Sequence, residues 1–155
     1  FKNGRINRKQ LALMREKLCE VDAGVVKIVV THHPFDVPAG ASESDVVGRA
    51  ERAMSALAAC GADLFLAGHL HLSHTTQTTK RYKIEGHSAV IVQAGTAVST
   101  RVRGEENSFN VIRIHRPQIT VERYQWDSAH RAFVTVTQEA FAHQVDGWQR
   151  IGRGP

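Results

Sequence analysis

Two histidine pairs each follow an apolar stretch of the chain. Residues 25–31 (VVKIVVT) lead into His32-His33-Pro34, and residues 62–67 (ADLFLA) lead into Gly68-His69-Leu70-His71. Short apolar runs bounded by turn residues are typical of buried β-strands. Neutral imidazole is the commonest metal ligand in proteins, so two such pairs at strand ends predict a metal site.

The spacing of the second pair has a geometric consequence. If the chain stays extended, residues two apart point the same way, so we expect His69 and His71 on one side and Leu70 on the other. Gly68 would let the backbone turn sharply. In open α/β sheets, ligands bind beyond the carboxyl ends of the strands, where both pairs are expected. The alternative is that these are ordinary loop histidines, but a metal site explains both the spacing and the glycine.

The first pair does not reveal its ligand. Because Pro34 holds His33 extended, we expect His32 and His33 to face opposite ways, so only one of them reaches the site, and the residues do not say which. His74 could reach the rim of the pocket. Asp36 and Asp63 are the nearest carboxylates in sequence, but neither is expected to bind metal. We interpret the other histidines as surface residues without partners: His87, His115, His130 and His143.

The surrounding pattern indicates an α/β (α+β) fold in which helix–strand units precede an antiparallel β-meander. Apolar spacing predicts a helix over residues 8–21 with Asn7 as N-cap, and a strand over 25–31 covered on both faces. A second helix is expected from Ser44 to about Cys60, stopped by Gly61. Further strands are expected over 62–67, 75–84, 88–95, 109–115, 119–126 and 132–136. From residue 139 onward the pattern is ambiguous, and residues 152–155 are expected to fray.

Composition narrows the function classes. The 155-residue chain has a net charge of +5, but its basic residues are scattered, so nucleic-acid binding is not expected to be its main role. No apolar stretch is long enough to cross a bilayer. Cys19 and Cys60 belong to no pairing motif, so we expect free thiols and a cytoplasmic location.

The two histidine motifs, the helix between them and the later meander with its Ala94-Gly95-Thr96 turn together resemble the C-terminal half of a calcineurin-like metallophosphoesterase. The chain is most similar to the bacterial class III cyclic-nucleotide phosphodiesterase branch. The resemblance implies a four-layer α/β/β/α sandwich around two divalent ions such as Mn, Fe or Zn. It implies that His32 and His69 bind one ion and His71 the other. A metal-bridging hydroxide would then attack a phosphodiester or phosphomonoester, cyclic nucleotides included.

The family's carboxylate-bearing motifs are missing from this chain. Asp-x-His, Gly-Asp-x-x-Asp and Gly-Asn-His-Asp/Glu belong to the N-terminal half of the family domain. We therefore expect residues 1–155, which start at Phe1, to be the C-terminal part of a single domain and inactive alone. The alternative is a non-catalytic metal-binding or regulatory module. Such a fragment would expose the edge of strand 25–31 and an apolar face, which favours a homodimer or aggregation.

Overall fold

The computed structural model describes residues 4–100 and 104–154, with side chains as far as residue 152. These residues form a mixed α/β fold, which confirms the predicted fold class. The elements in order are α1 (Arg8–Cys19), β1 (Ile28–Thr31), the short 3-10 helix η1 (Glu43–Asp45), α2 (Ala50–Ala58), β2 (Leu64–Ala67), β3 (His74–Gln77), the 3-10 helix η2 (Thr78–Lys80), β4 (Val90–Gln93), β5 (Ser108–His115), β6 (Gln118–Asp127), β7 (Ala132–Gln144) and β8 (Gly147–Gly154).

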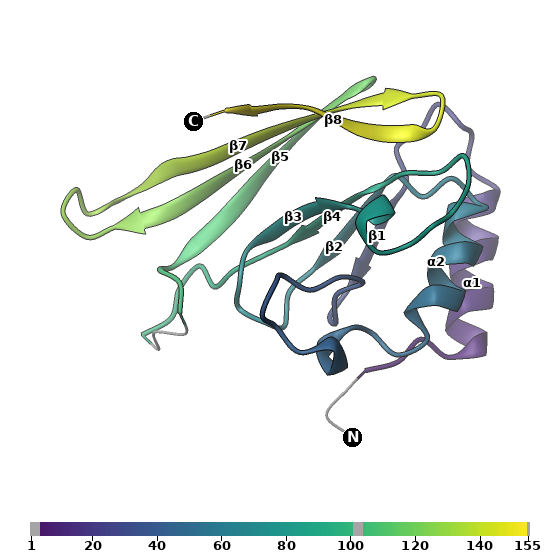
Figure 1. The fold of residues 1–155 in the computed structure, drawn as a ribbon, viewed down its shortest axis with the longest axis horizontal. Helices are drawn as coiled ribbons and strands as arrows, with labels where there is room; N and C mark the ends of the chain where they lie inside the picture. The colour runs from purple at the N-terminus through teal and green to yellow at the C-terminus, as the bar shows by residue number, and fades with distance from the viewer. Residues whose placement is uncertain (1–3, 101–103, 155) are drawn as a thin grey trace.

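The first sheet has the strand order β1-β2-β4-β3, with β1, β2 and β4 parallel and β3 antiparallel to β4. Helices α1 and α2 lie side by side on one face of it (Figure 1). Phe65 and Ile91 from the sheet pack with Met54 and Leu57 from α2, all four nearly inaccessible to solvent. Because these strands are parallel, both histidine motifs follow carboxyl ends that lie at the same end of this sheet.

The second sheet is the predicted antiparallel meander, in the order β5-β6-β7-β8. It covers the other face of the first sheet, where Leu64 and Val90 meet Ile119 and Phe141. The indole N–H of Trp148 donates to the buried Asp63 across 2.8 Å and ties β8 to the first sheet. Among residues 4–100 and 104–154 the layers are therefore α/β/β, and the second helical layer of the expected sandwich is not among them.

The helix ends follow local sequence signals only in part. Asn7 caps α1 as predicted, accepting from the backbone N–H of Gln10, whose side chain accepts from Asn7 in return. Ser44 does not start the second helix. The short helix η1 intervenes, and α2 begins after Arg49, which adopts a left-handed backbone conformation. Gly61 ends this unit with φ of +72°, as expected.

The expectation that residues 25–31 are covered on both faces is wrong, as strand β1 shows. It is the edge strand of its sheet, and while Val29 is 4% exposed, its neighbours Ile28 and Val30 are 41% and 71% exposed. A β-branched apolar run predicts a strand packed on both faces, although a strand with one face open has the same composition. The predicted exposed edge and apolar face are confirmed.

Cys19 and Cys60 form a disulfide, so the prediction of free thiols is wrong. Their Cα atoms lie 4.4 Å apart, since Cys19 ends α1 and Cys60 follows the end of α2, which packs beside α1. No sequence motif indicates that these two cysteines lie close together in the fold. The cytoplasmic prediction loses the support that free cysteines would give it. In the part of the chain that the structure describes, no helix is long and apolar enough to span a membrane.

The C-terminal residues also differ from expectation. The ambiguous stretch after residue 139 continues β7 without a break, and β8 then pairs with β7 as far as Gly154 rather than fraying. Conversely, the strand predicted over 75–84 stops at Gln77 and passes into η2. Strand β8 is held in place because its own residue Trp148 is buried against the first sheet.

Candidate metal centre

Three histidines gather at the carboxyl edge of the first sheet. His32 and His33 follow β1 and His69 follows β2, and one nitrogen atom from each lies within 4.8 Å of the other two. Nδ1 of His69 and Nε2 of His32 are 3.0 Å apart. The ring centroids of His33 and His69 are 4.1 Å apart. Two of the predicted ligands, His32 and His69, are thus brought together.

The backbone turns sharply from Gly68, whose carbonyl accepts from the backbone N–H of Leu70 across 3.0 Å, but Gly68 is not the left-handed residue of the turn. The left-handed conformations belong to His69, with φ of +74°, and His71, with φ of +59°. Histidine enters this region several-fold more often than most residues, yet such a conformation still costs free energy. The motif therefore leaves the extended geometry that would place His69 and His71 on one side.

His33 joins the cluster, so the expectation that it faces away from His32 is wrong. Strict alternation holds only while the chain is a strand, and β1 ends at Thr31. The Thr31 hydroxyl donates to the His33 carbonyl across 2.8 Å within the bend that follows. The adjacent pair in the sequence was the available signal, and the assumption of an extended chain concealed it.

His71 lies outside this cluster. Its Nδ1 is 2.6 Å from the hydroxyl oxygen of Thr96, in the turn after β4. The Ala94-Gly95-Thr96 turn therefore contacts the motif instead of serving only as a connection. The assignment of His71 to a second ion stays a prediction.

Electrostatics favours neutral imidazoles in the cluster. Burial lowers the pKa of His69, and the charges that His33 and His32 would carry lower it further. Asp45, in η1, acts in the opposite direction and raises this pKa. Metal ligation requires the unprotonated ring, so a lowered pKa keeps His69 ready to bind. Asp45 was not singled out from the sequence, which gives no signal that η1 faces this edge.

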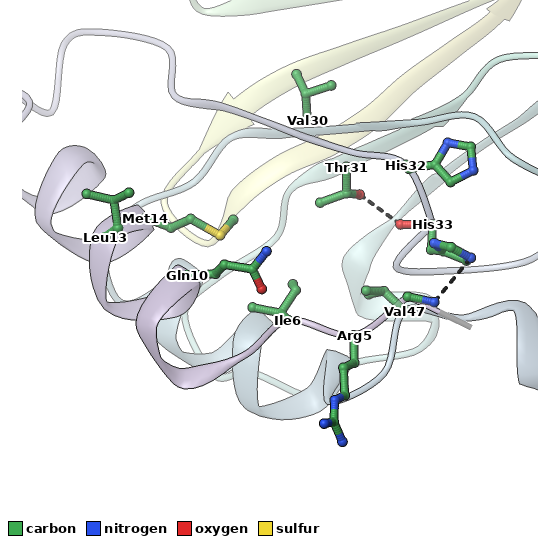
Figure 2. Close-up of a pocket in the computed structure, with 11 residues that line it drawn as sticks. Arg5, Ile6, Gln10, Leu13, Met14, Val30, Thr31, His32, His33 and Val47 are labelled. Carbon is green, nitrogen blue, oxygen red and sulfur yellow. Dashed lines mark hydrogen bonds between the residues drawn. The ribbon is translucent and has the colours of Figure 1, made fainter. Parts of the chain in front are cut away.

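The cluster borders a cavity of about 410 Å³ between α1 and β1. Figure 2 shows His32 and His33 at one end of it, with Val30 and Met14 along its walls. His33 also accepts a hydrogen bond through Nε2 from the backbone N–H of Gly4, drawn in the same view. His32 and His33 therefore have open space beside them.

The remaining histidines are mostly not the isolated surface residues expected. His130 bonds Asp127 across 2.7 Å, and the ring of His143 meets the buried Trp148 edge-on. His87 is half-buried, and burial lowers its pKa. His115 alone matches the expectation, since it is exposed.

His74 and the two carboxylates considered earlier serve the interior. His74 Nε2 lies 3.6 Å from the buried Asp36, which also pairs with Arg81. Asp63 accepts from the backbone of Lys27 and from Trp148, so it holds strands together at the far end of the sheet from the cluster.

Comparison with known proteins finds no matching family model and no matching curated protein. Two solved structures of Vps29 from Entamoeba histolytica are similar in part. A single-mutant crystal structure shares 20% identity at a TM-score of 0.42, covering 70% of this chain and 53% of that one. A double mutant shares 12% identity at a TM-score of 0.37, with coverage of 88% and 92%. This chain thus spans about half the length of the first of them. Neither structure bears on the cyclic-nucleotide branch.

Proposed function

We propose that this chain is a metal-binding module that holds one divalent transition-metal ion between His32, His33 and His69. The 3.0 Å contact between His69 and His32 supports the proposal most directly. Two imidazole nitrogens this close can bind the same ion once the rings turn so that both lone pairs point at it, because Zn–N bonds are about 2.0–2.1 Å long. This reading is the non-catalytic alternative weighed from the sequence.

The donor set narrows the choice of ion. Imidazole nitrogen suits zinc and iron, whereas manganese and magnesium are bound more readily by carboxylates. The cluster contains imidazoles only, as far as residues 4–100 and 104–154 are concerned. Zinc or ferrous iron is therefore favoured over manganese. The half-buried, low-pKa environment of His69 lets binding proceed at neutral pH.

Hydrolysis of a phosphate ester is the second candidate function, proposed for a longer protein that supplies carboxylate ligands. The open flank of the cluster favours it, because His32 is exposed and the 410 Å³ cavity adjoins it. In that protein His71 would bind a second ion, and a metal-bound hydroxide would attack a phosphodiester or phosphomonoester. Three neutral imidazoles do not offset the charge of two divalent ions, so we expect no turnover by residues 1–155 alone.

Titration calorimetry with zinc tests the first function on the purified chain. We expect one ion per chain for the wild type and loss of that binding in His69→Ala. Cleavage of a chromogenic phosphodiester, followed in parallel with manganese and with zinc, tests the second. Hydrolysis that disappears in His69→Ala would show that the chain is a complete enzyme and would contradict the non-catalytic reading.

A further inference from the structure

The loop that carries His32 and His33 is anchored immediately after them. Although His32 is exposed, the next residues are buried, with Phe35 1% and Asp36 7% exposed. The Phe35 ring packs against Phe65 of β2 at a centroid distance of 4.9 Å. A buried carboxylate three residues from a metal-binding histidine calls for an explanation, because burying a charge is costly unless it is paired.

The partners of this loop come from one short segment, residues 74–82. Arg81 donates to Oδ1 of Asp36 across 3.3 Å, and His74 Nε2 lies 3.6 Å from Oδ2. The Tyr82 hydroxyl donates to the carbonyl oxygen of Phe35 across 2.5 Å. Both residues of the loop base are therefore held from the same side.

Arg81 is itself fixed by a second carboxylate. It pairs with Glu43 of η1, so its guanidinium joins two segments that flank the histidine cluster. The planar guanidinium restricts Asp36, whose side chain is 10% exposed, while the pair with Glu43, which is 75% exposed, adds less. Asp36 is thus fixed in place. It would act on His32 and His33 through the backbone of their shared loop, without touching either ring.

We propose that Asp36 is a positioning residue for the metal centre and that Arg81 and Tyr82 act through it and Phe35 to fix the His32–His33 bend. This inference rests on the proposed metal-binding function. Ligand rings must be held within a fraction of an ångström for full affinity. Freeing the loop base would let His32 and His33 separate from His69, which is carried by a different strand.

The test compares cobalt binding by the wild-type chain with binding by Asp36→Asn and by Tyr82→Phe. Asn keeps the shape of the side chain without its charge, and Phe keeps the buried ring without its hydroxyl. Ile119→Val, in the core of the second sheet, is the control for lost stability alone. Calorimetry measures affinity, the visible absorption of bound cobalt reports coordination geometry, and denaturant unfolding measures stability.

We expect both loop variants to bind cobalt about tenfold more weakly than the wild type, as outer-shell changes at metal sites do, with altered absorption bands. Ile119→Val should keep wild-type affinity and bands. Wild-type affinity and bands in both loop variants, or changes in Ile119→Val that match theirs at equal stability, would overturn the positioning role. If Asp36→Asn fails to fold, Tyr82→Phe decides. A wild-type chain that binds no cobalt would contradict the metal-binding function itself, and this inference with it.

Discussion

The backbone N–H of Gly4 donates to Nε2 of His33 across 3.3 Å. A neutral imidazole that accepts through Nε2 carries its proton on Nδ1, so neither nitrogen is free for a metal while this bond exists. Ligation by His33 must therefore replace the Gly4 contact. His32 and His69, which share their own contact, are free of that competition.

Gly4→Ala should weaken zinc binding, by about tenfold if the ring shift resembles an outer-shell defect. A Cβ at this position would lie 2.5 Å from Nδ1 of His33, closer than such atoms approach, so the ring must move. Gly24→Ala is the matched control, since a Cβ there meets nothing within 4 Å. Calorimetry on both variants makes the comparison. Equal affinities would show that displacing the His33 ring from its place beside Gly4 does not affect the ion.

The effect of replacing a histidine on zinc affinity should depend on whether that histidine lies in the cluster. His32→Ala should lower zinc affinity more than the 10–100-fold typical of outer-shell changes, because it removes a ligand. His71→Ala should change single-ion binding much less, since His71 bonds Thr96 outside the cluster. His115→Ala, at an exposed position, should change nothing. A loss of zinc in His71→Ala equal to that in His32→Ala would move the site toward the Gly68-His69-Leu70-His71 motif.

Reduction of the Cys19–Cys60 disulfide should destabilise the fold. The bridge closes a loop with a sequence separation of 41 residues, for which loss of chain entropy in the unfolded state is worth roughly 3 to 4 kcal/mol. For a chain of this size that corresponds to about 10 °C in melting temperature. Calorimetric melting with and without a thiol reductant, paired with thiol counting by mass spectrometry, measures it. Two free thiols in the chain purified without reductant would contradict the bridge.

Tyr82 should ionise at a higher pH than an ordinary tyrosine. Burial raises the pKa of its hydroxyl to about 12, with the charge of Asp36 acting in the same direction and Arg81 against it. An unfolded tyrosine has a pKa of about 10, so between these two values the unfolded chain releases the proton more readily and the fold loses stability as pH rises. The ultraviolet absorbance of tyrosinate follows the titration. Tyr82→Phe should remove the part of the absorbance change that occurs at the highest pH. If that part persists in the variant, it does not come from Tyr82.

The sequence predicts the architecture better than it predicts contacts. Apolar periodicity located the helix after Asn7 and most strands of both sheets, because each signal is local. The Cys19–Cys60 bridge and the association of Asp36 with Arg81 depend on segments far apart in the chain, and no local pattern records them. The sequence predicts that only one of His32 and His33 reaches the site, because the alternation of a strand was extended past Thr31, where the strand ends.

X-ray absorption at the zinc edge of the zinc-loaded chain tests the central claim most directly, because multiple scattering from imidazole rings counts the histidine ligands. The account predicts three imidazoles around one zinc ion, and loss of the ordered site in His69→Ala. A spectrum dominated by oxygen neighbours, or one unchanged by His69→Ala, would contradict a metal centre built from His32, His33 and His69.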